Sequence, residues 1–171
     1  MSKTITILGS YGTVGLAIKE FLGPQPNIKV LEAGEHSRDF TYKDESIAAS
    51  DLVVLCLPST VVEQEVSAIL RINPNCMILD TSVKFRYKQD WCYGLPELTG
   101  ETNISKSQFV ANPGCFATAC ILTGLPLRSF QPENKPFVFT GFTGYTARGK
   151  SGIHTKTPEL VQFGEQHKRI S

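Results

Sequence analysis

Short runs of apolar and β-branched residues alternate along this chain with segments in which apolar residues recur at helical spacing. The first run covers residues 4–8 and ends in a glycine-rich turn, and a helical pattern then covers residues 16–22 and closes on a Gly-Pro pair. Further apolar runs at residues 28–33, 52–57 and 76–79 predict three more strands. The predicted order is strand, turn, helix, strand, and this order repeats.

The segment between the last two of these runs predicts an amphipathic helix. Val62, Val66, Ile69 and Leu70 fall at positions i, i+4, i+7 and i+8, so they share one helical face. Continuous apolar strands joined by helices are typical of a parallel sheet that is covered on both faces. The pattern therefore predicts an α/β fold with a Rossmann-like parallel sheet.

The remaining sequence predicts the start of a second domain. It opens with a short strand at residues 109–110, passes through a Pro-Gly turn into a helix from about Phe116, and contains an aromatic run at residues 137–142 that predicts another strand. We expect a first domain over residues 1–111. Residues 112–171 are expected to be the N-terminal part of a second, α+β domain.

Composition limits the possible functions. The chain has 171 residues, of which 41% are hydrophobic and 19% charged, as in ordinary globular proteins. The net charge of +1 and the lack of a basic stripe argue against nucleic-acid binding. The longest apolar run, residues 52–57, is far shorter than the roughly 20 residues of a membrane-spanning helix, and the first apolar stretch breaks at Gly9, too early for a signal peptide. We expect a soluble, cytoplasmic protein.

The cysteines indicate a reducing compartment. There are five cysteines at irregular spacing and three histidines, so neither a disulfide framework nor a metal site is expected. Cys56 lies within an apolar run and Cys120 within the predicted second-domain helix, so both are interpreted as small core residues. Cys92 stays unassigned.

The glycine turn after the first strand is the first candidate for chemistry. Gly9, Gly12 and Gly15 lie where the chain turns tightly into a helix, so backbone N–H groups, including those of Thr13 and Val14, could hold a pyrophosphate. Their spacing is G-x-x-G-x-x-G, and a plain strand-to-helix turn remains the alternative. The interpretation that we prefer is a dinucleotide site.

Residues after the second and third strands are expected to complete this site. Glu32 could accept a hydrogen bond from a ribose 2′-hydroxyl, whereas Arg38, with Ser37 beside it, could bind a 2′-phosphate. We favour NADPH, with a solvated surface arginine as the alternative. Pro58 and Ser59, after the third strand, are counted with the cofactor-binding residues.

Cys115 is the second candidate for chemistry. It follows a Pro-Gly pair directly, at the entrance to a predicted helix, where the helix dipole and free N–H groups stabilise a thiolate and an oxyanion. Position alone leaves a nucleophile and a buried core residue equally open.

Four linked segments around these residues resemble the N-acetyl-γ-glutamyl-phosphate reductase family, in its shorter form. They are residues 76–86 (CMILDTSVKFR), 91–98 (WCYGLPEL), 112–115 (NPGC) and 144–150 (GYTARGK). The resemblance implies a homo-oligomeric enzyme that uses NADPH to reduce N-acetyl-γ-glutamyl phosphate, a small acyl phosphate, to N-acetylglutamate semialdehyde and phosphate in arginine biosynthesis.

The resemblance also implies roles for particular residues. Cys115 matches the family's nucleophile, which would form a thioester, and Arg86 matches the arginine that recognises phosphate. The Asn112 amide and the Cys115 backbone N–H are candidate oxyanion donors. His167, in a segment that resembles the family's His-Lys-His, is the candidate acid, although Arg169 stands where the second histidine would be.

Two further cations and two further histidines complete the set of candidate residues. Arg148 and Lys150 are candidate ligands of a substrate carboxylate, with plain surface exposure as the alternative. His36 and His154 are interpreted as solvated loop residues.

The chain stops soon after the His167 segment, whereas the family's polypeptide continues, so we expect a truncated form. Such a chain would bind nucleotide better than it turns over substrate. Three alternatives stay open: a related reductase such as aspartate-semialdehyde dehydrogenase, a non-catalytic nucleotide-binding fragment, and a half-domain that needs a partner chain for activity.

Overall fold

The computed structural model describes residues 2–33, 40–130 and 135–142. The chain divides into two compact units, Met1–Gly114 and Cys115–Ser171, which are described separately. The sequence-based boundary lay between residues 111 and 112.

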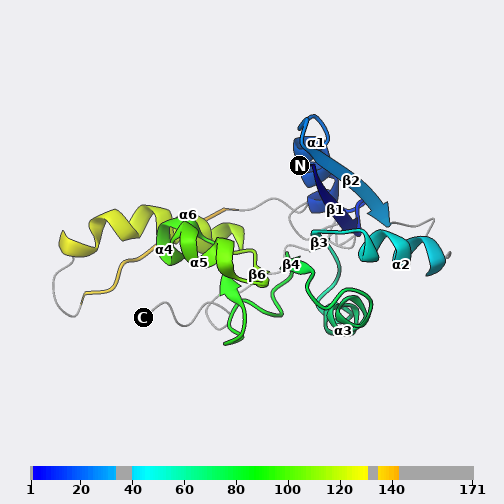
Figure 1. Ribbon diagram of the computed structural model, residues 1–171. Helices are drawn as coiled ribbons and strands as arrows, with labels where there is room; N and C mark the ends of the chain where they lie inside the picture. The colour runs from blue at the N-terminus through cyan, green and yellow to red at the C-terminus, as the bar shows by residue number, and fades with distance from the viewer. Residues whose placement is uncertain (1, 34–39, 131–134, 143–171) are drawn as a thin grey trace, which may run out of the picture. The chain divides into compact units, whose positions relative to one another are not determined.

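Unit 1 is built on a six-stranded parallel sheet (Figure 1). The strand order is β2-β1-β3-β4-β6-β5, and all five strand pairs are parallel. The strands are β1 (Lys3–Leu8), β2 (Ile28–Ala33), β3 (Leu52–Leu55), β4 (Met77–Asp80), β5 (Cys92–Tyr93) and β6 (Phe109–Ala111). The helices of this unit are α1 (Thr13–Leu22), α2 (Phe40–Ala48), α3 (Val62–Ile72), α4 (Pro96–Thr99) and α5 (Glu101–Lys106).

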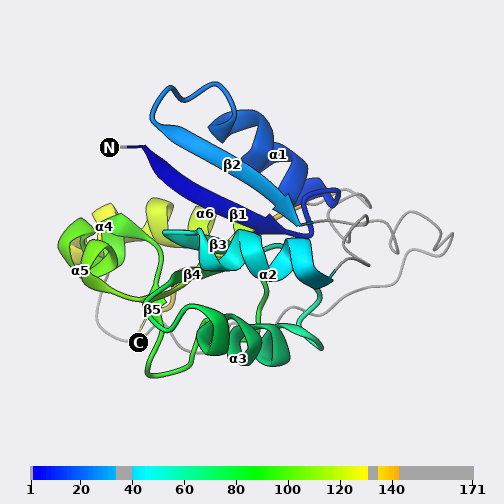
Figure 2. The same cartoon turned by 45° about the vertical axis from the view of Figure 1, so that its right-hand side comes forward.

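Helices lie on both faces of the sheet (Figure 2). On one face, Ile5, Ile7 and Val54 form a buried cluster against which Ile18 and Leu22 of α1 pack. On the other face, a larger cluster unites strand residues with Ile47 of α2 and with Val62 and Ile69 of α3. Alternate residues of one strand point to opposite faces, so the continuous apolar strands serve both clusters. The predicted α/β fold with a doubly covered parallel sheet is confirmed.

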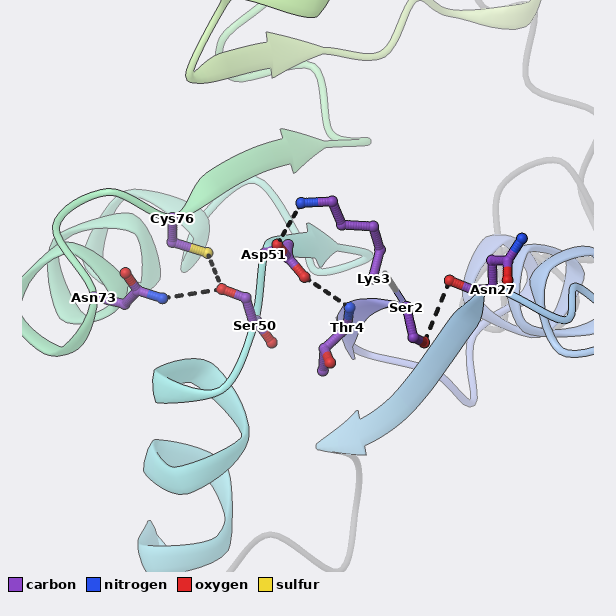
Figure 3. Close-up of polar contacts among 8 residues, drawn as sticks. All are labelled: Ser2, Lys3, Thr4, Asn27, Ser50, Asp51, Asn73 and Cys76. Carbon is purple, nitrogen blue, oxygen red and sulfur yellow. Dashed lines mark hydrogen bonds and ion pairs between the residues drawn. The ribbon is translucent and has the colours of Figure 1, made fainter.

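The amino ends of β1 and β3 are joined by a polar clasp (Figure 3). The Asp51 carboxylate accepts hydrogen bonds from Lys3 Nζ at 2.7 Å and from the Thr4 backbone N–H at 2.8 Å. These contacts lower the pKa of Asp51 below its ordinary value. The clasp lies at the end of the sheet opposite to the glycine turn.

The loop between β4 and β5 is held by aromatic stacking. Trp91 is buried, and its ring stacks on Phe85 with a centroid distance of 4.0 Å and on Phe109 with a centroid distance of 5.3 Å. Phe85 is 1% exposed. This aromatic stack fixes the segment that carries Arg86.

Several predicted element boundaries were wrong. The third strand ends at Leu55 and not at residue 57, because its neighbours β1 and β4 end at Leu8 and Asp80, the residues that pair with Leu55. Cys56 therefore lies beyond the strand. The fourth strand begins at Met77, after the buried Cys76, and ends at Asp80.

The predicted strand at residues 137–142 was also wrong. These residues have no regular secondary structure, and the described part of unit 2 otherwise contains only α6 (Cys115–Gly124) and the 3-10 helix η1 (Leu125–Phe130). A strand needs a neighbouring strand to bind its backbone, and this part of unit 2 offers none. The rings of Phe137 and Phe139 lie instead against Gly124.

Candidate functional site

The carboxyl ends of the parallel strands bring most of the candidate residues of unit 1 to one edge of the sheet. β1 and β3 are neighbours at the centre, and the chain proceeds from β1 to β2 on one side and then to β3 on the other. Such a reversal of strand order is where open α/β sheets bind ligands. The glycine turn after β1 lies at this point.

Two glycines let the turn close on itself. Gly9 has a φ of +83°, and a Cβ added there would lie 2.3 Å from the carbonyl oxygen of Cys56, the residue after β3. A Cβ on Gly15 would lie 2.3 Å from the Gly9 carbonyl oxygen. Both neighbours are backbone atoms that cannot rotate away, so glycine is required at both positions.

The third glycine leaves the start of α1 open. Gly12 is the N-cap residue, with no side-chain cap, and a Cβ there would be in ordinary contact at 3.5 Å from Gly9 O. The Gly12 N–H donates to Gly9 O at 3.2 Å, which points the chain into the helix. The N–H groups of the first turn, at Thr13 and Val14, follow without a side-chain cap. The arrangement suits a bound phosphate, whose oxygens would accept these hydrogen bonds.

Ser10, which sequence analysis did not single out, belongs to the same turn. Its side chain is fully buried, and its hydroxyl has no hydrogen-bond partner in the part of the chain that the structure describes. A buried hydroxyl without a partner costs free energy.

Glu32 forms an ion pair with a neighbouring residue. Its carboxylate pairs with Lys19 Nζ of α1 at 2.7 Å, and this hydrogen bond raises the pKa of Lys19. The pair weakens the case for Glu32 as the acceptor for a ribose hydroxyl. Ser37 and Arg38 lie outside the described residues. Pro58, exposed, and Ser59, half-buried, follow β3 at the same edge as the glycine turn.

A second group of polar residues lies at the ends of β4 and β6. Asp80, the last residue of β4, is fully buried, and its Oδ2 accepts a hydrogen bond from Ser82 Oγ at 2.6 Å. Oδ1 has no partner among the residues described, and burial raises the pKa of Asp80. Ser82 Oγ in turn accepts from the Lys84 N–H at 3.1 Å, which closes a tight turn after the strand.

Arg86 reaches from this turn to the end of β6. Its Nε donates to the Asn112 carbonyl oxygen at 2.9 Å, and its Nη2 donates to the Thr81 carbonyl oxygen at 3.3 Å. The Asn112 N–H donates to Asp80 O at 2.8 Å, and the Asn112 side chain donates to Pro113 O at 3.1 Å. The structure therefore brings Arg86 and Asn112 together, as neighbouring parallel strands require.

The cysteines differ in their surroundings. Cys115 is the first residue of α6 and is exposed, so it is not a core residue. Cys76 is buried, which raises its pKa to about 11. Cys56 is half-buried against the Ile5 cluster, and burial raises its pKa too. Cys120 is half-buried within α6, and Cys92 is half-buried in β5.

Several predicted residues cannot be placed. Arg148, Lys150 and His167 lie outside the described residues, as does the segment at 144–150. None of the helices in the described ranges has the length and apolar composition of a membrane span. The same ranges contain no group of three or more His, Cys, Asp or Glu side chains arranged to hold a metal ion.

The comparisons with known proteins agree with this fold. Residues 4–106 match the family described as "Semialdehyde dehydrogenase, NAD binding domain". The match covers more than half of the chain, so the chain belongs to this family, and unit 1 contains its NAD-binding domain.

Curated relatives show which kind of enzyme in this family the chain is similar to. N-acetyl-γ-glutamyl-phosphate reductase from Rhizobium rhizogenes is 32% identical over 158 residues, which are 90% of this chain and 51% of the relative. The reductase from Chelativorans sp. is 34% identical over 175 residues, covering 96% of this chain and 56% of the relative. The resemblance predicted from the motifs is confirmed. The chain spans about half the length of the curated relatives that it matches.

Solved structures share the fold. Aspartate semialdehyde dehydrogenase II from Vibrio cholerae, complexed with ASA, superposes with a TM-score of 0.65 at 13% identity, over 90% of this chain and 50% of that one. The Candida albicans aspartate semialdehyde dehydrogenase with NADP gives a TM-score of 0.56 at 15% identity, over 77% of this chain and 48% of that one.

Proposed function

We propose that this chain carries the nucleotide-binding and nucleophile-bearing part of an enzyme that reduces N-acetyl-γ-glutamyl phosphate to N-acetylglutamate semialdehyde with NADPH. One observation carries the proposal: the similarity to reductases of that name extends over 90% of the chain, well beyond the NAD-binding residues 4–106. It therefore includes sequence of unit 2, which begins at Cys115.

The first chemical step belongs to Cys115. An exposed thiol at the first residue of a helix can be held as a thiolate by the helix dipole. The thiolate would attack the acyl carbon, the bond from that carbon to the phosphate oxygen would break, and phosphate would leave, so that a thioester remains on Cys115. Arg86 would bind the phosphate group of the substrate.

NADPH, when bound, supplies the hydride that reduces this thioester. The residues of the chain then stabilise charge and move a proton. The Asn112 amide and the Cys115 N–H would donate to the oxyanion, and His167 would supply the proton as the carbon–sulfur bond breaks and the aldehyde leaves. Arg148 and Lys150 would pair with a substrate carboxylate. The enzyme would act as a homo-oligomer.

The glycine turn supports the cofactor assignment. Its uncapped helix start offers N–H groups to a pyrophosphate, and Pro58 and Ser59 follow the neighbouring strand. Glu32 is paired with Lys19, so it is a poor acceptor for a ribose 2′-hydroxyl. Arg38, aided by Ser37, would instead bind a 2′-phosphate through a charge-assisted contact. This favours NADPH over NADH.

The acyl-transfer half of the proposal can be tested without nucleotide. The chain is mixed with N-acetyl-γ-glutamyl phosphate, quenched in acid, and examined by intact mass and peptide mapping. We expect about one phosphate released per chain at first, with the acyl group on Cys115. Cys115→Ala should abolish both signals, and Cys120→Ala, the matched control on the same helix, should keep them. Phosphate release without acylation of Cys115 would contradict the thioester.

The nucleotide half is tested by titration with NADPH and NADH, followed by nicotinamide fluorescence. We expect NADPH to bind about tenfold or more tightly than NADH, the size of a charge-assisted contact. Arg38→Ala should remove this preference, and Arg71→Ala, a cation at the end of α3, should keep it. Nucleotide binding with no acylation of Cys115 would leave a non-catalytic nucleotide-binding protein.

A further inference from the structure

Arg86 makes its contacts with the protein before any substrate is present. Its guanidinium donates to the carbonyl oxygen of Asn112, which follows β6, and to that of Thr81, which follows β4. Two strand ends that are neighbours in the sheet are thus tied by one planar group. The planar fork of arginine suits such a double contact, and the single ammonium of lysine does not.

Gly114 shows how closely the guanidinium lies against the chain. A Cβ added at Gly114 would be 2.8 Å from Arg86 Nη1 and 3.5 Å from Arg86 Cζ. The space that a side chain at position 114 would occupy is filled by this guanidinium. The absence of a side chain at Gly114 is therefore part of the same arrangement.

The turn that carries Arg86 is itself held firmly. The Asp80 carboxylate accepts from Ser82 Oγ, which in turn accepts from the Lys84 N–H. On the other side, Phe85 is buried and stacked on Trp91. Arg86 thus starts from a fixed backbone, so its hydrogen bonds restrain the loop that they reach and not merely its own side chain.

We propose that Arg86 is a positioning residue, which clamps the backbone of Asn112-Pro113-Gly114 immediately before Cys115, with Gly114 as the position that accommodates it. The inference rests on the proposed function of Cys115 as the nucleophile. It adds a role to the contact with substrate phosphate that the resemblance implies, and this role operates in the free protein.

The test separates the two roles with a reagent that carries no phosphate. The rate of Cys115 alkylation by iodoacetamide is measured from pH 6 to pH 9 in the full chain, together with acyl transfer from N-acetyl-γ-glutamyl phosphate. We expect Arg86→Ala and Gly114→Ala each to slow alkylation by about tenfold, as expected for loss of charge-assisted hydrogen bonds. Arg86→Lys should not restore the rate.

Two comparisons control this experiment. Lys84→Ala removes a cation from the same turn, one that pairs with Glu63, and should alter the rate by less than about twofold, as for other exposed pairs. The double variant Arg86→Ala with Gly114→Ala should be no slower than Arg86→Ala alone, because the added Cβ then meets no guanidinium. Arg86→Gln replaces Arg86→Ala if circular dichroism shows that the alanine variant loses the native fold.

The outcomes are distinguishable. Normal alkylation in the Arg86 and Gly114 variants, with a raised KM for the acyl phosphate, would make Arg86 a substrate ligand only and overturn the positioning role. Additive effects in the double variant would also overturn it. If Cys115 of the unmodified chain reacts no faster than the other four thiols, the proposed function itself fails.

Discussion

The two loops at the carboxyl edge of the sheet are built in opposite ways. In the glycine turn, backbone packs against backbone, and a Cβ on Gly9 or Gly15 would meet a carbonyl oxygen. In the second loop, a side chain packs against backbone, and a Cβ on Gly114 would meet the end of Arg86. The first arrangement has no freedom to adjust, whereas the second can adjust by rotation of one side chain. A rigid backbone turn suits the binding of a cofactor that is the same in every turnover. A contact made by one side chain can instead be adjusted by a change of that side chain.

The largest expected effect comes from breaking the backbone cradle. Gly9→Ala places a Cβ on a residue with a φ of +83° and against Cys56 O, so we expect unfolding to become easier by about 3 kcal/mol or more. Nucleotide binding should be lost even at temperatures where the chain stays folded. Urea denaturation and NADPH titration measure the two effects.

Gly100→Ala separates backbone strain from the clash. Gly100 has a φ of +85°, and nothing lies within 4 Å of an added Cβ. Its alanine variant should lose only about 1–3 kcal/mol, because strain acts alone. Equal losses in the Gly9 and Gly100 variants would show that the contact with Cys56 O contributes nothing.

A smaller effect is expected in the second loop, where the free energy of unfolding should depend on pH through Asp80. Burial raises the pKa of Asp80 above its ordinary value of 3.8, although Ser82 and Arg86 act in the opposite direction. As the pH rises from about 4, the unfolded chain loses this proton first, so the free energy of unfolding falls until the folded-state pKa is passed.

Asp80→Asn removes that titration. The difference in unfolding free energy between the original chain and this variant should therefore shift in favour of the variant as pH rises above about 4. Urea melts at half-unit steps from pH 4 to pH 7 measure it, with Gly100→Ala as a control whose difference stays flat. A difference that is constant with pH would contradict the raised pKa.

The smallest effect on stability is expected at Gly12. Its φ of −77° suits any residue, and the added Cβ meets only an ordinary contact, so Gly12→Ala should cost less than about 1 kcal/mol. NADPH binding should weaken far more than stability, because the Cβ would stand at the open start of α1. Equal loss of binding and stability would argue against a phosphate at this position.

The fold was predictable where apolar residues make a complete pattern. This pattern predicts strands β1 to β4, which lie in the sheet, and helices α1 and α3, each of which packs one apolar face on the sheet. The sequence pattern did not predict helix α2. Among the side chains of this helix that the structure describes, Ile47 is the large apolar one that is buried and Tyr42 is exposed, so no apolar face could be recognised. β5 has only two residues, and α4 and α5 are short, so no periodicity could develop.

The candidate site was predictable only in part, for a related reason. Glycines mark a backbone turn in the sequence itself, and Gly9 and Gly15 hold that turn as expected. The contact of Arg86 with Asn112 and Gly114 joins segments that are far apart along the chain, and the pattern of neither segment alone predicts it. The roles of Ser10 and Asp80 depend on burial, which no local pattern reports.

Trp91 is the only tryptophan of the chain, and its indole is stacked between Phe85 and Phe109 in the core of unit 1. Tryptophan emission moves to longer wavelength when the ring becomes exposed to water, so this residue is a built-in optical probe of that core. Residues from Cys115 onward contain no tryptophan. The emission of the whole chain therefore follows the unfolding of the nucleotide-binding unit and of the Arg86 turn beside it, without any attached label.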